Sequence, residues 1–173
     1  MFKSFLPLLF VGIMLTAFVA PVPVTDSVIE ILQGSKKVFN FSAGLKSAEL
    51  VTMLEGKGPY TIFAPLNTAF AKLPAGSLEN LFKPENKTTL TSLLNYHIVP
   101  LQLTKADLVA GINQGNGKMI LKTMLGKTLT ATLADGKLQL TDAQGTIAYI
   151  TYADKLGTNG VVHFIDGVLM PAK

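Results

Sequence analysis

The chain has 173 residues, and 15 basic against 11 acidic side chains give a formal net charge of +4. This length suits a single domain of about 150 residues. The absence of cysteine excludes disulfides, cysteine-ligated zinc and iron–sulfur clusters. Every basic residue is a lysine, and the lysines are scattered. They do not indicate a nucleic-acid partner, which arginine usually contacts. They indicate a solvated surface, or weak attraction to anionic surfaces such as membranes or acidic polysaccharides.

Residues 1–20 have the pattern of a secretory signal peptide, with one lysine near the start, a long apolar run and a small residue at its end. Two prolines follow. Cleavage after Ala20 would leave Phe18 at a position that usually holds a small residue, so an uncleaved membrane anchor is the alternative. In either case we expect an exported protein that is secreted, periplasmic or at the cell surface. An exported chain without cysteine fits a bacterial envelope better than a small eukaryotic ectodomain.

The first half of the mature chain has mostly helical apolar spacing. One buried strand, Tyr60 to Ala64, is expected to end at Pro65, and the segment from Gly111 to Gly117 is expected to be a loop. The expected helices are one capped by Thr25 or Asp26, one from Phe41 to Leu54, one capped by Asn67, one over Ser77 to Phe82, one starting at Asn86 or Thr88, and one over Lys105 to Ala110.

The second half, from Lys118 onward, has a period of two. The run from Thr128 to Leu140 predicts a hairpin whose type I′ turn is Asp135-Gly136. A further strand is expected over Thr146 to Tyr152, followed by two short apolar arms around Asp166-Gly167. Helices followed by strands predict an α+β fold in which helices pack against an antiparallel sheet.

Three segments together resemble the fasciclin-like domain family over residues 25–172. They are TIFAPLNTAF (61–70), LNYHIVP (94–100) and NGVVHFIDGVLMP (159–171). The resemblance implies a single α+β domain with a two-sheet β-wedge or sandwich and a layer of short helices. It also implies extracytoplasmic adhesion or ligand binding rather than catalysis. Leu66 departs from the family, which more often has a small polar residue there, and Thr68 replaces a frequent acidic residue.

Most residues of these segments have structural readings. Phe63 and Phe70 flank a strand–turn–helix joint in which Pro65 breaks the strand and Asn67 caps the helix. The step at Asn159-Gly160 is a turn. The family-motif residues for which we expect structural roles are Thr61, Phe63, Pro65, Asn67, Phe70, Asn159, Gly160, His163 and Asp166.

Two places are candidate interaction sites. Tyr96 and His97 end the strongest helix, where the helix dipole favours a protonated histidine. The alternative is that Tyr96 and His97 are a partly buried pair with a structural role, hydrogen-bonded to local backbone groups. In some animal members of the family this neighbourhood is implicated in integrin binding. Asp154 and Leu156 match an Asp-Ile-type adhesion sequence of such members, although Lys155 replaces the isoleucine; otherwise they lie in a solvated loop.

We find no motif of a hydrolase elbow, metalloprotease, phosphate-binding loop or dinucleotide site, and we expect no enzyme, cofactor or metal. A metal pair of His97 and His163 would need a third ligand such as Asp154 or Asp166. The main hypothesis is an exported, non-catalytic adhesion or binding module. The runner-up is a carrier or sensor that holds a small apolar ligand or lipid in a helix–sheet pocket, and a metal-dependent enzyme is a remote third.

The expected partner is a cell-surface or matrix protein, a polysaccharide or a lipid. Nucleic acid is not expected, and a membrane is expected only through an uncleaved leader. We expect a monomer. The sequence does not decide whether Leu66 and Lys155 change a binding face, or whether the glycosylation sequons at Asn40 and Asn86 are used.

Overall fold

The computed structural model describes residues 24–172. The leader expected over residues 1–20 therefore lies outside the described part. Within residues 24–172, no helix combines the length and the apolar character needed to cross a membrane.

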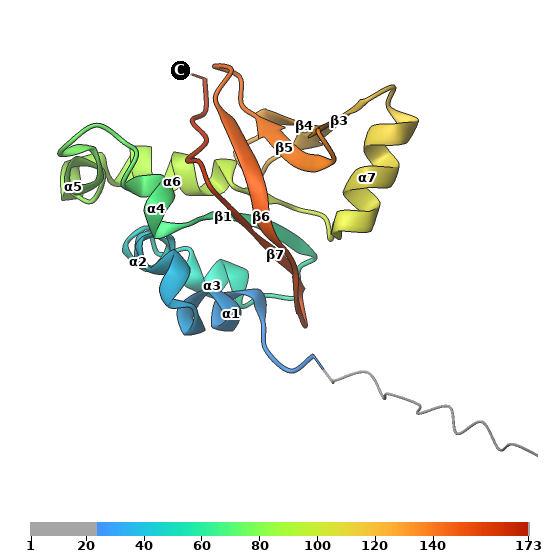
Figure 1. Ribbon diagram of the computed structural model, residues 1–173. Coiled ribbons are helices and arrows are strands. Elements are labelled where there is room, and N and C mark those ends of the chain that lie inside the picture. The colour runs from blue at the N-terminus through green and yellow to red at the C-terminus, as the bar shows by residue number, and fades with distance from the viewer. Residues whose placement is uncertain (1–23, 173) are drawn as a thin grey trace, which may run out of the picture.

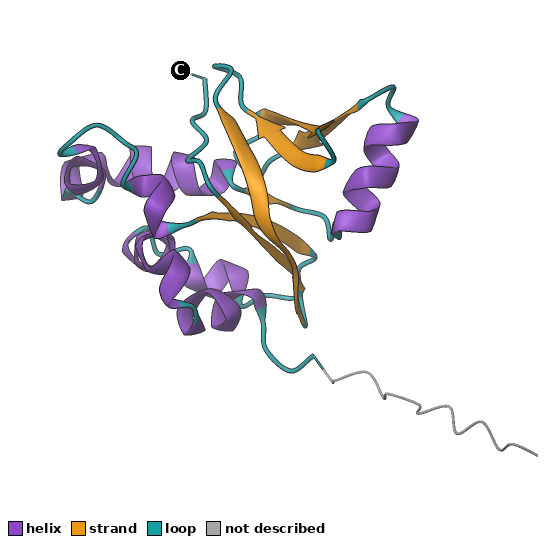
Figure 2. Ribbon diagram, viewed as in Figure 1, coloured by secondary structure: helices purple, strands orange, loops and turns teal. Residues whose placement is uncertain are grey.

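Helices predominate before Lys118, with β1 and β2 among them, and strands follow from there. Figure 2 shows both kinds of element in space. The helices are α1 (Val28–Gly34), α2 (Phe39–Ser47), α3 (Val51–Leu54), α4 (Asn67–Phe70), α5 (Ser77–Leu81), α6 (Lys87–Tyr96) and α7 (Lys105–Gln114), with 3-10 turns η1 (Lys36–Val38) and η2 (Pro84–Asn86). The strands are β1 (Tyr60–Pro65), β2 (Ile98–Val99), β3 (Lys118–Lys122), β4 (Thr128–Ala134), β5 (Lys137–Thr141), β6 (Ile147–Gly157) and β7 (Gly160–Ile165).

The seven strands pair in the order β2-β1-β7-β6-β5-β4-β3. The long strand β6 pairs with β5 near its start and with β7 further on, so it joins two sheet halves in one continuous order. The prediction of an antiparallel sheet is wrong for one pair of strands, because β1 and β7 are parallel. Parallel pairing needs a long connection, and here that connection contains most of the helices and the whole second sheet half.

Two apolar clusters fill the molecule in layers. One lies between the helices α1 to α6 and one face of the first sheet half, β2-β1-β7. The other lies between the opposite face of that half, the second half β3-β4-β5 and α7. Figure 1 shows α1, α2 and α3 gathered on one side of β1 and β7, while α7 lies beside β3 and β4. The expected α+β fold with a layer of short helices is confirmed.

Two expected helix caps are wrong. Ser27, and neither Thr25 nor Asp26, caps α1, because Ser27 and Glu30 form a reciprocal capping box. Asn67 begins α4 without capping it. Its side chain instead accepts a hydrogen bond from the backbone N–H of Asn40 and donates one to a carbonyl of η1, which ties the joint after β1 to the helical layer.

The helix expected from Phe41 to Leu54 is divided in two. After α2 the backbone of Glu49 is left-handed, with φ 60°. The N–H of Leu50 returns to the carbonyl of Leu45, and that of Glu49 returns to the carbonyl of Lys46. This pair of bonds is the Schellman motif that ends many helices. The interruption separates α2 from α3 and leaves a bend on the surface between them.

Two further boundaries differ from expectation. The glycine-rich segment after Ala110 is not a loop from its start, because α7 continues to Gln114. Gly111 lies where a side chain would overlap the sulfur of Met119, so its role is the close approach of α7 to β3. Of the two strand arms expected around Asp166-Gly167, only the first is a strand, since β7 ends at Ile165. The turn at Asp135-Gly136 is confirmed, with positive φ at both residues.

Asn159 connects three elements at the hairpin between β6 and β7. Its side-chain oxygen accepts the N–H of Val28 at 2.9 Å. Its amide donates to the carbonyls of Leu54 and Gly56, both at 2.7 Å. Its own carbonyl accepts the N–H of Tyr60 at 3.1 Å. The residue is 8% exposed, so these bonds replace water at a buried junction.

We predict that Asn159→Ala lowers the free energy of unfolding by about 3 kcal/mol, because backbone groups of α1, α3 and the turn after α3 lose their side-chain partner. Urea unfolding followed by circular dichroism measures the change. Asn113→Ala, at an exposed position of α7, is the matched control and should shift stability by less than about 0.5 kcal/mol. Equal stability of the two variants would contradict the role given to Asn159.

Candidate functional site

His97 is fully buried just after α6, with both ring nitrogens bonded to backbone. Nδ1 lies 2.8 Å from the carbonyl of Leu93, and Nε2 accepts the N–H of Leu169 at 3.2 Å. A carbonyl requires a donor and an N–H requires an acceptor, so these partners assign the neutral ring with its proton on Nδ1. The ring of Phe41 packs edge-on at 5.8 Å. His97 therefore joins α6, α2 and the segment after β7.

The protonated state favoured by the helix dipole is wrong for His97. Burial lowers its pKa from 6.5 to about 4, against the opposing effects of the Leu93 carbonyl and the Asp142 carboxylate. Desolvation of a charge outweighs a dipole effect that operates at exposed helix ends. A positive charge would also place an N–H against the N–H of Leu169. The imidazole is thus a neutral structural connector.

Tyr96 is also fully buried. Its hydroxyl donates to the carbonyl of Thr128 at 2.8 Å and accepts the N–H of Ala143 at 3.3 Å. Burial raises the pKa of this phenol. Neither Tyr96 nor His97 presents its side chain to solvent, so the two residues shape the surface from beneath and do not form it.

Asp142 is an organising residue that the sequence-based predictions missed, although an aspartate that opens a turn is a recognisable signal. It is 6% exposed. Its Oδ1 accepts the N–H groups of Gln144 and Thr146, and its Oδ2 accepts the N–H of Met170. The carboxylate therefore fixes the loop between β5 and β6 and attaches the segment after β7 to it.

His163 occupies the middle of β7 and is fully buried. Its Nδ1 accepts the N–H of Asp154 at 3.2 Å, and its Nε2 lies 2.8 Å from the carbonyl of Leu103. These partners assign a neutral ring with the proton on Nε2, the opposite tautomer to His97. The ring stacks on Phe63 at 5.6 Å. Burial lowers the pKa of His163, while the Leu103 carbonyl and the Asp154 carboxylate oppose the shift.

Asp154 and Leu156 lie on an irregular stretch of β6. The register with β7 shifts on both sides of Tyr152, and Asp154 has a left-handed backbone with φ 57°. The carboxylate of Asp154 accepts the first N–H of α7, from Lys105, at 2.7 Å. Leu156 is 46% exposed. Asp154 is therefore partly committed to the fold, while Leu156 and Lys155 are open to solvent.

The other family-motif residues hold the joint around β1. Thr61 is buried and bonds through its hydroxyl to Leu101 and Leu103 of the crossing segment. Gly160 lies so close to the Tyr60 carbonyl that a side chain would overlap it. Asp166 accepts the N–H of Tyr149 at 2.7 Å. The remaining buried members are Phe63, Pro65 and Phe70.

The residues named for a metal site do not come together as one. Among residues 24–172, no group of three or more histidine, aspartate or glutamate side chains is arranged to hold a metal ion. The four ring nitrogens of His97 and His163 are committed to backbone groups. The sequon residues are half-buried: Asn86 donates to the carbonyl of Asn80, and the backbone of Asn40 donates to Asn67.

The surface on the helical side carries an aromatic ridge between two hollows. The ring of Tyr152 is 47% exposed, and the amine of Lys37 lies 4.0 Å above its centre. Phe164 supports the ring edge-on at 6.1 Å. A hollow of about 670 Å³, which Lys36 and Lys155 also line, lies on one side. A smaller one of about 230 Å³, which Leu66 lines, lies on the other. We call Lys37, Tyr152 and Lys155 the Tyr152 surface.

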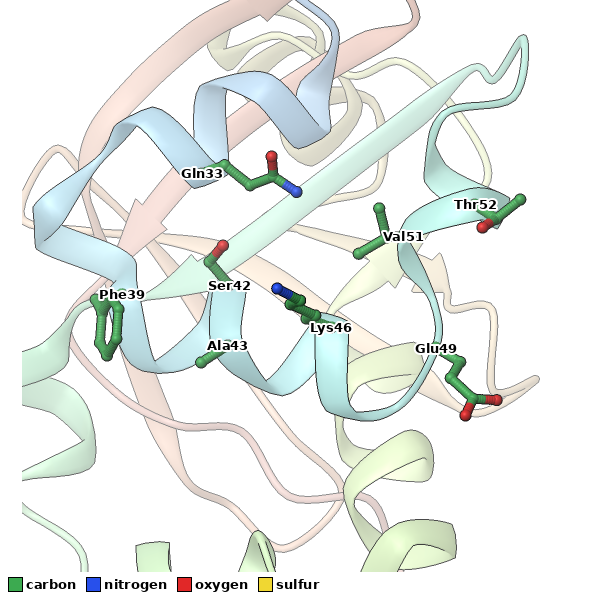
Figure 3. A pocket seen from close by; sticks show the side chains of 8 residues that line it. All are labelled: Gln33, Phe39, Ser42, Ala43, Lys46, Glu49, Val51 and Thr52. Carbon is green, nitrogen blue, oxygen red and sulfur yellow. The ribbon is translucent and has the colours of Figure 1, made fainter.

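A separate hollow of about 660 Å³ lies between α1, α2 and α3. Figure 3 shows Gln33, Ser42 and Val51 around it, with the Phe39 ring at one end. Glu49 points away from it and pairs with Lys87 at 2.8 Å. The interruption of the helix at Glu49 is what separates α2 from α3 here. The hollow is open to solvent, and most of its lining is apolar.

Known proteins that are similar to this chain agree with this fold. The Fasciclin domain family matches residues 36–171. "Protein sll1483" of Synechocystis sp. is 38% identical over 150 residues, covering 85% of this chain and 76% of that protein. The "Transforming growth factor-beta-induced protein ig-h3" of Sus scrofa is 34% identical over 149 residues, covering 86% of this chain but 20% of that protein.

A solved structure agrees with these matches. It is a FAS1 domain pair from the insect cell adhesion molecule Fasciclin I, with a TM-score of 0.74 and 20% identity. The match covers 84% of this chain and 51% of that chain. At this identity the likeness shows the fold alone. The resemblance inferred from the three segments is confirmed.

We predict that the free energy of unfolding falls by at least about 2 kcal/mol between pH 7.5 and 5.0. The unfolded His97 gains a proton near pH 6.5, whereas the folded one stays neutral until about pH 4. The contribution of neutral His97 to stability is therefore complete above pH 6.5. It is lost as the pH falls from about 6.5 toward 4. His163 acts in the same direction. Urea unfolding at each pH measures the effect.

The control is His97→Gln, which should make the profile shallower because residue 97 no longer titrates, while the contribution of His163 remains. Imidazole ¹⁵N spectra of the wild type test the cause directly, since His97 should stay neutral at pH 5 with its proton on Nδ1. A histidine that titrates near pH 6.5 in the folded protein would contradict the account.

Proposed function

The chain belongs to the fasciclin domain family, and on that premise we propose that it is an exported, non-catalytic binding module for a cell-surface or matrix protein. The insect protein that shares the fold is described as a cell adhesion molecule. The leader pattern of residues 1–20 supports export. Function is carried by sites more than by folds, so the proposal depends on the surface that could receive the partner.

The buried polar groups support a non-catalytic role. His97, His163 and Asp142 are bonded to backbone groups that position loops and strands. A general base must reach its substrate, and a nucleophile needs a base within hydrogen-bond distance. These three side chains are nine-tenths or more buried and already have partners, so their chemistry serves the fold.

The exposed, supported ring of Tyr152 is the observation that carries the proposal. A large aromatic side chain that is held in place loses little entropy on binding, and tyrosine is enriched among residues that dominate interface energetics. Here Lys37 covers one face of the ring and Phe164 supports it. The hollows on both sides provide depth for partner side chains.

The candidate residues Asp154 and Leu156 follow Tyr152 on the same strand. Both lie on the opposite side of the sheet from its ring, because Asp154 contacts His163 and the first N–H of α7, and Leu156 pairs with Val161. Lys155 pairs with Val162 and shares the side of Tyr152. Lys155 lines the larger hollow, so its replacement of the family's isoleucine puts a cation on the proposed face. Leu66 lines the smaller hollow and belongs to that face as well.

The carrier alternative requires an enclosed apolar cavity of about 300 Å³ or more. The hollow between α1, α2 and α3 exceeds that volume, but it is an open groove at the surface. A second groove of about 380 Å³ lies between α6 and the segment after β7, and it is likewise open. These grooves favour surface contacts over enclosure of a small ligand.

We predict that Tyr152→Ala weakens binding of the purified, fluorescently labelled protein to the surface of the producing cells by about 30-fold, as expected for loss of a central aromatic contact. Phe39→Ala is the matched control, because Phe39 is a 65% exposed aromatic on the same helical layer but outside this surface. Flow cytometry over a concentration series gives the apparent Kd.

Treating the cells with protease should abolish binding if the partner is a protein. Equal losses in the Tyr152 and Phe39 variants would contradict the site. Binding that survives protease treatment would contradict the proposed class of partner.

Export has its own test. We predict that mass spectrometry of cell fractions finds a species starting near Pro21 in the periplasm or medium. An intact Met1 species in the membrane fraction would indicate a tethered module with the same outward role. A full-length species confined to the cytosol would contradict export and with it the proposed function.

A further inference from the structure

The second sheet half has one covered and one uncovered face. Residues that point inward from β3 to β6, such as Leu129, Leu140 and Ala148, belong to the core beside α7. The alternate residues point outward, and Figure 2 shows α7 beside this part of the sheet. The register aligns the outward residues in two full rows and one short row.

The rows are set by the strand pairing. The first row is Lys118, Thr132, Gln139 and Tyr149; the second is Ile120, Thr130, Thr141 and Ile147; and the third, at the end of β3, is Lys122 and Thr128. Lys137 stands beside the first row, opposite Ala134. We call these residues the outer face.

The outer face is cationic and rich in hydroxyl groups. It has three lysines and four threonines, and none of the residues in its rows is acidic. Three carboxylates adjoin its residues along the chain or by a hydrogen bond. Asp135 lies in the hairpin turn beside Lys137, Asp142 follows Thr141 and is bonded to backbone N–H groups, and Asp166 accepts the N–H of Tyr149. The fold thus places three of the fifteen scattered lysines on one sheet face.

The spacing of the lysines favours a ligand with repeated charges. Lys118 and Lys122 are four residues apart on one strand, about 13 Å between Cα atoms, and Lys137 is two strands away from β3, about 10 Å. Their backbone positions do not converge on one point, as a site for a single phosphate or a small anion would. They match negative charges spread along a linear chain.

We propose that the outer face binds a linear acidic polysaccharide of the polyuronate class. The lysine amines pair with carboxylates of separate, non-adjacent sugar residues along the chain. Thr130, Thr132 and Gln139 lie between the lysines and exchange hydrogen bonds with sugar hydroxyls. Ile120 and Ile147 form the two ends of the second row and are 56% and 47% exposed. They contact the apolar faces of the sugar rings.

Other polyanions fit this face less well. Nucleic-acid surfaces usually present arginine and aromatic platforms for bases, and this chain has no arginine. A membrane-binding surface inserts large apolar groups into the lipid, whereas the centre of this face is threonine and glutamine. An acidic peptide would use the lysines but would have less need of the hydroxyl rows.

The test uses polygalacturonate as the probe, with the full chain and titration calorimetry at low salt. The triple variant Lys118→Gln, Lys122→Gln and Lys137→Gln should lose at least about 10-fold in affinity. The matched control, Lys46→Gln, Lys57→Gln and Lys83→Gln, removes the same charge from exposed positions on the helical side and should lose much less. Affinity of the wild type should fall steeply as salt rises.

A second variant separates the hydroxyl groups from the charge. Thr130→Val with Thr132→Val keeps side-chain shape and should weaken binding to polygalacturonate while leaving weak binding to polyglutamate unchanged. Equal losses in the two lysine triples would overturn the proposal, because binding would follow net charge alone. Wild-type affinity for polyglutamate or for phosphatidylglycerol vesicles that equals the affinity for polygalacturonate would also overturn it, as would no binding to polygalacturonate.

Discussion

The parallel pairing of β1 with β7 is the constraint on which the rest of the structure depends. Six residue pairs, from Tyr60–Gly160 to Pro65–Ile165, align the first and third family segments side by side. The pairing requires glycine at position 160, where the two backbones come closest. It also places Phe63 against His163 and brings Asn159 to the helical layer. Because parallel neighbours need a long connection, everything between these strands must fold around them.

The buried polar residues serve that pairing. His163 attaches β7 to the segment before α7, and Thr61 attaches β1 to the same segment. His97 and Asp142 attach the stretch after β7 to α6 and to the β5–β6 loop. Each buried group satisfies backbone donors or acceptors that would otherwise be costly to bury. The family's most recognisable polar residues are therefore structural, and recognition is left to the surface.

The two surfaces proposed for recognition lie on different layers of the described part of the chain. The Tyr152 surface belongs to the helical side, where β6 and η1 meet. The outer face belongs to the second sheet half, beyond the core that contains α7. The strand β6 contributes residues to both. Together, the two proposals describe a module that binds a protein partner on one layer and a polysaccharide on another.

Local patterns in the sequence determined much of this protein. The period of two, the Asp135-Gly136 turn and the strand before Pro65 are short-range effects of backbone sterics, and all three predictions are confirmed. The three ordered segments determined the family and its fold class.

Tertiary structure decided what local rules could not. His97 is neutral because Phe41 and Leu169 bury it, which overrides the helix dipole. Asn67 turns from its helix end to η1, and Asn159 bonds to Val28, 131 residues away. The outer face exists only through strand register. In each case the deciding partner is distant in the chain, and the energy of burial or pairing exceeds the local preference.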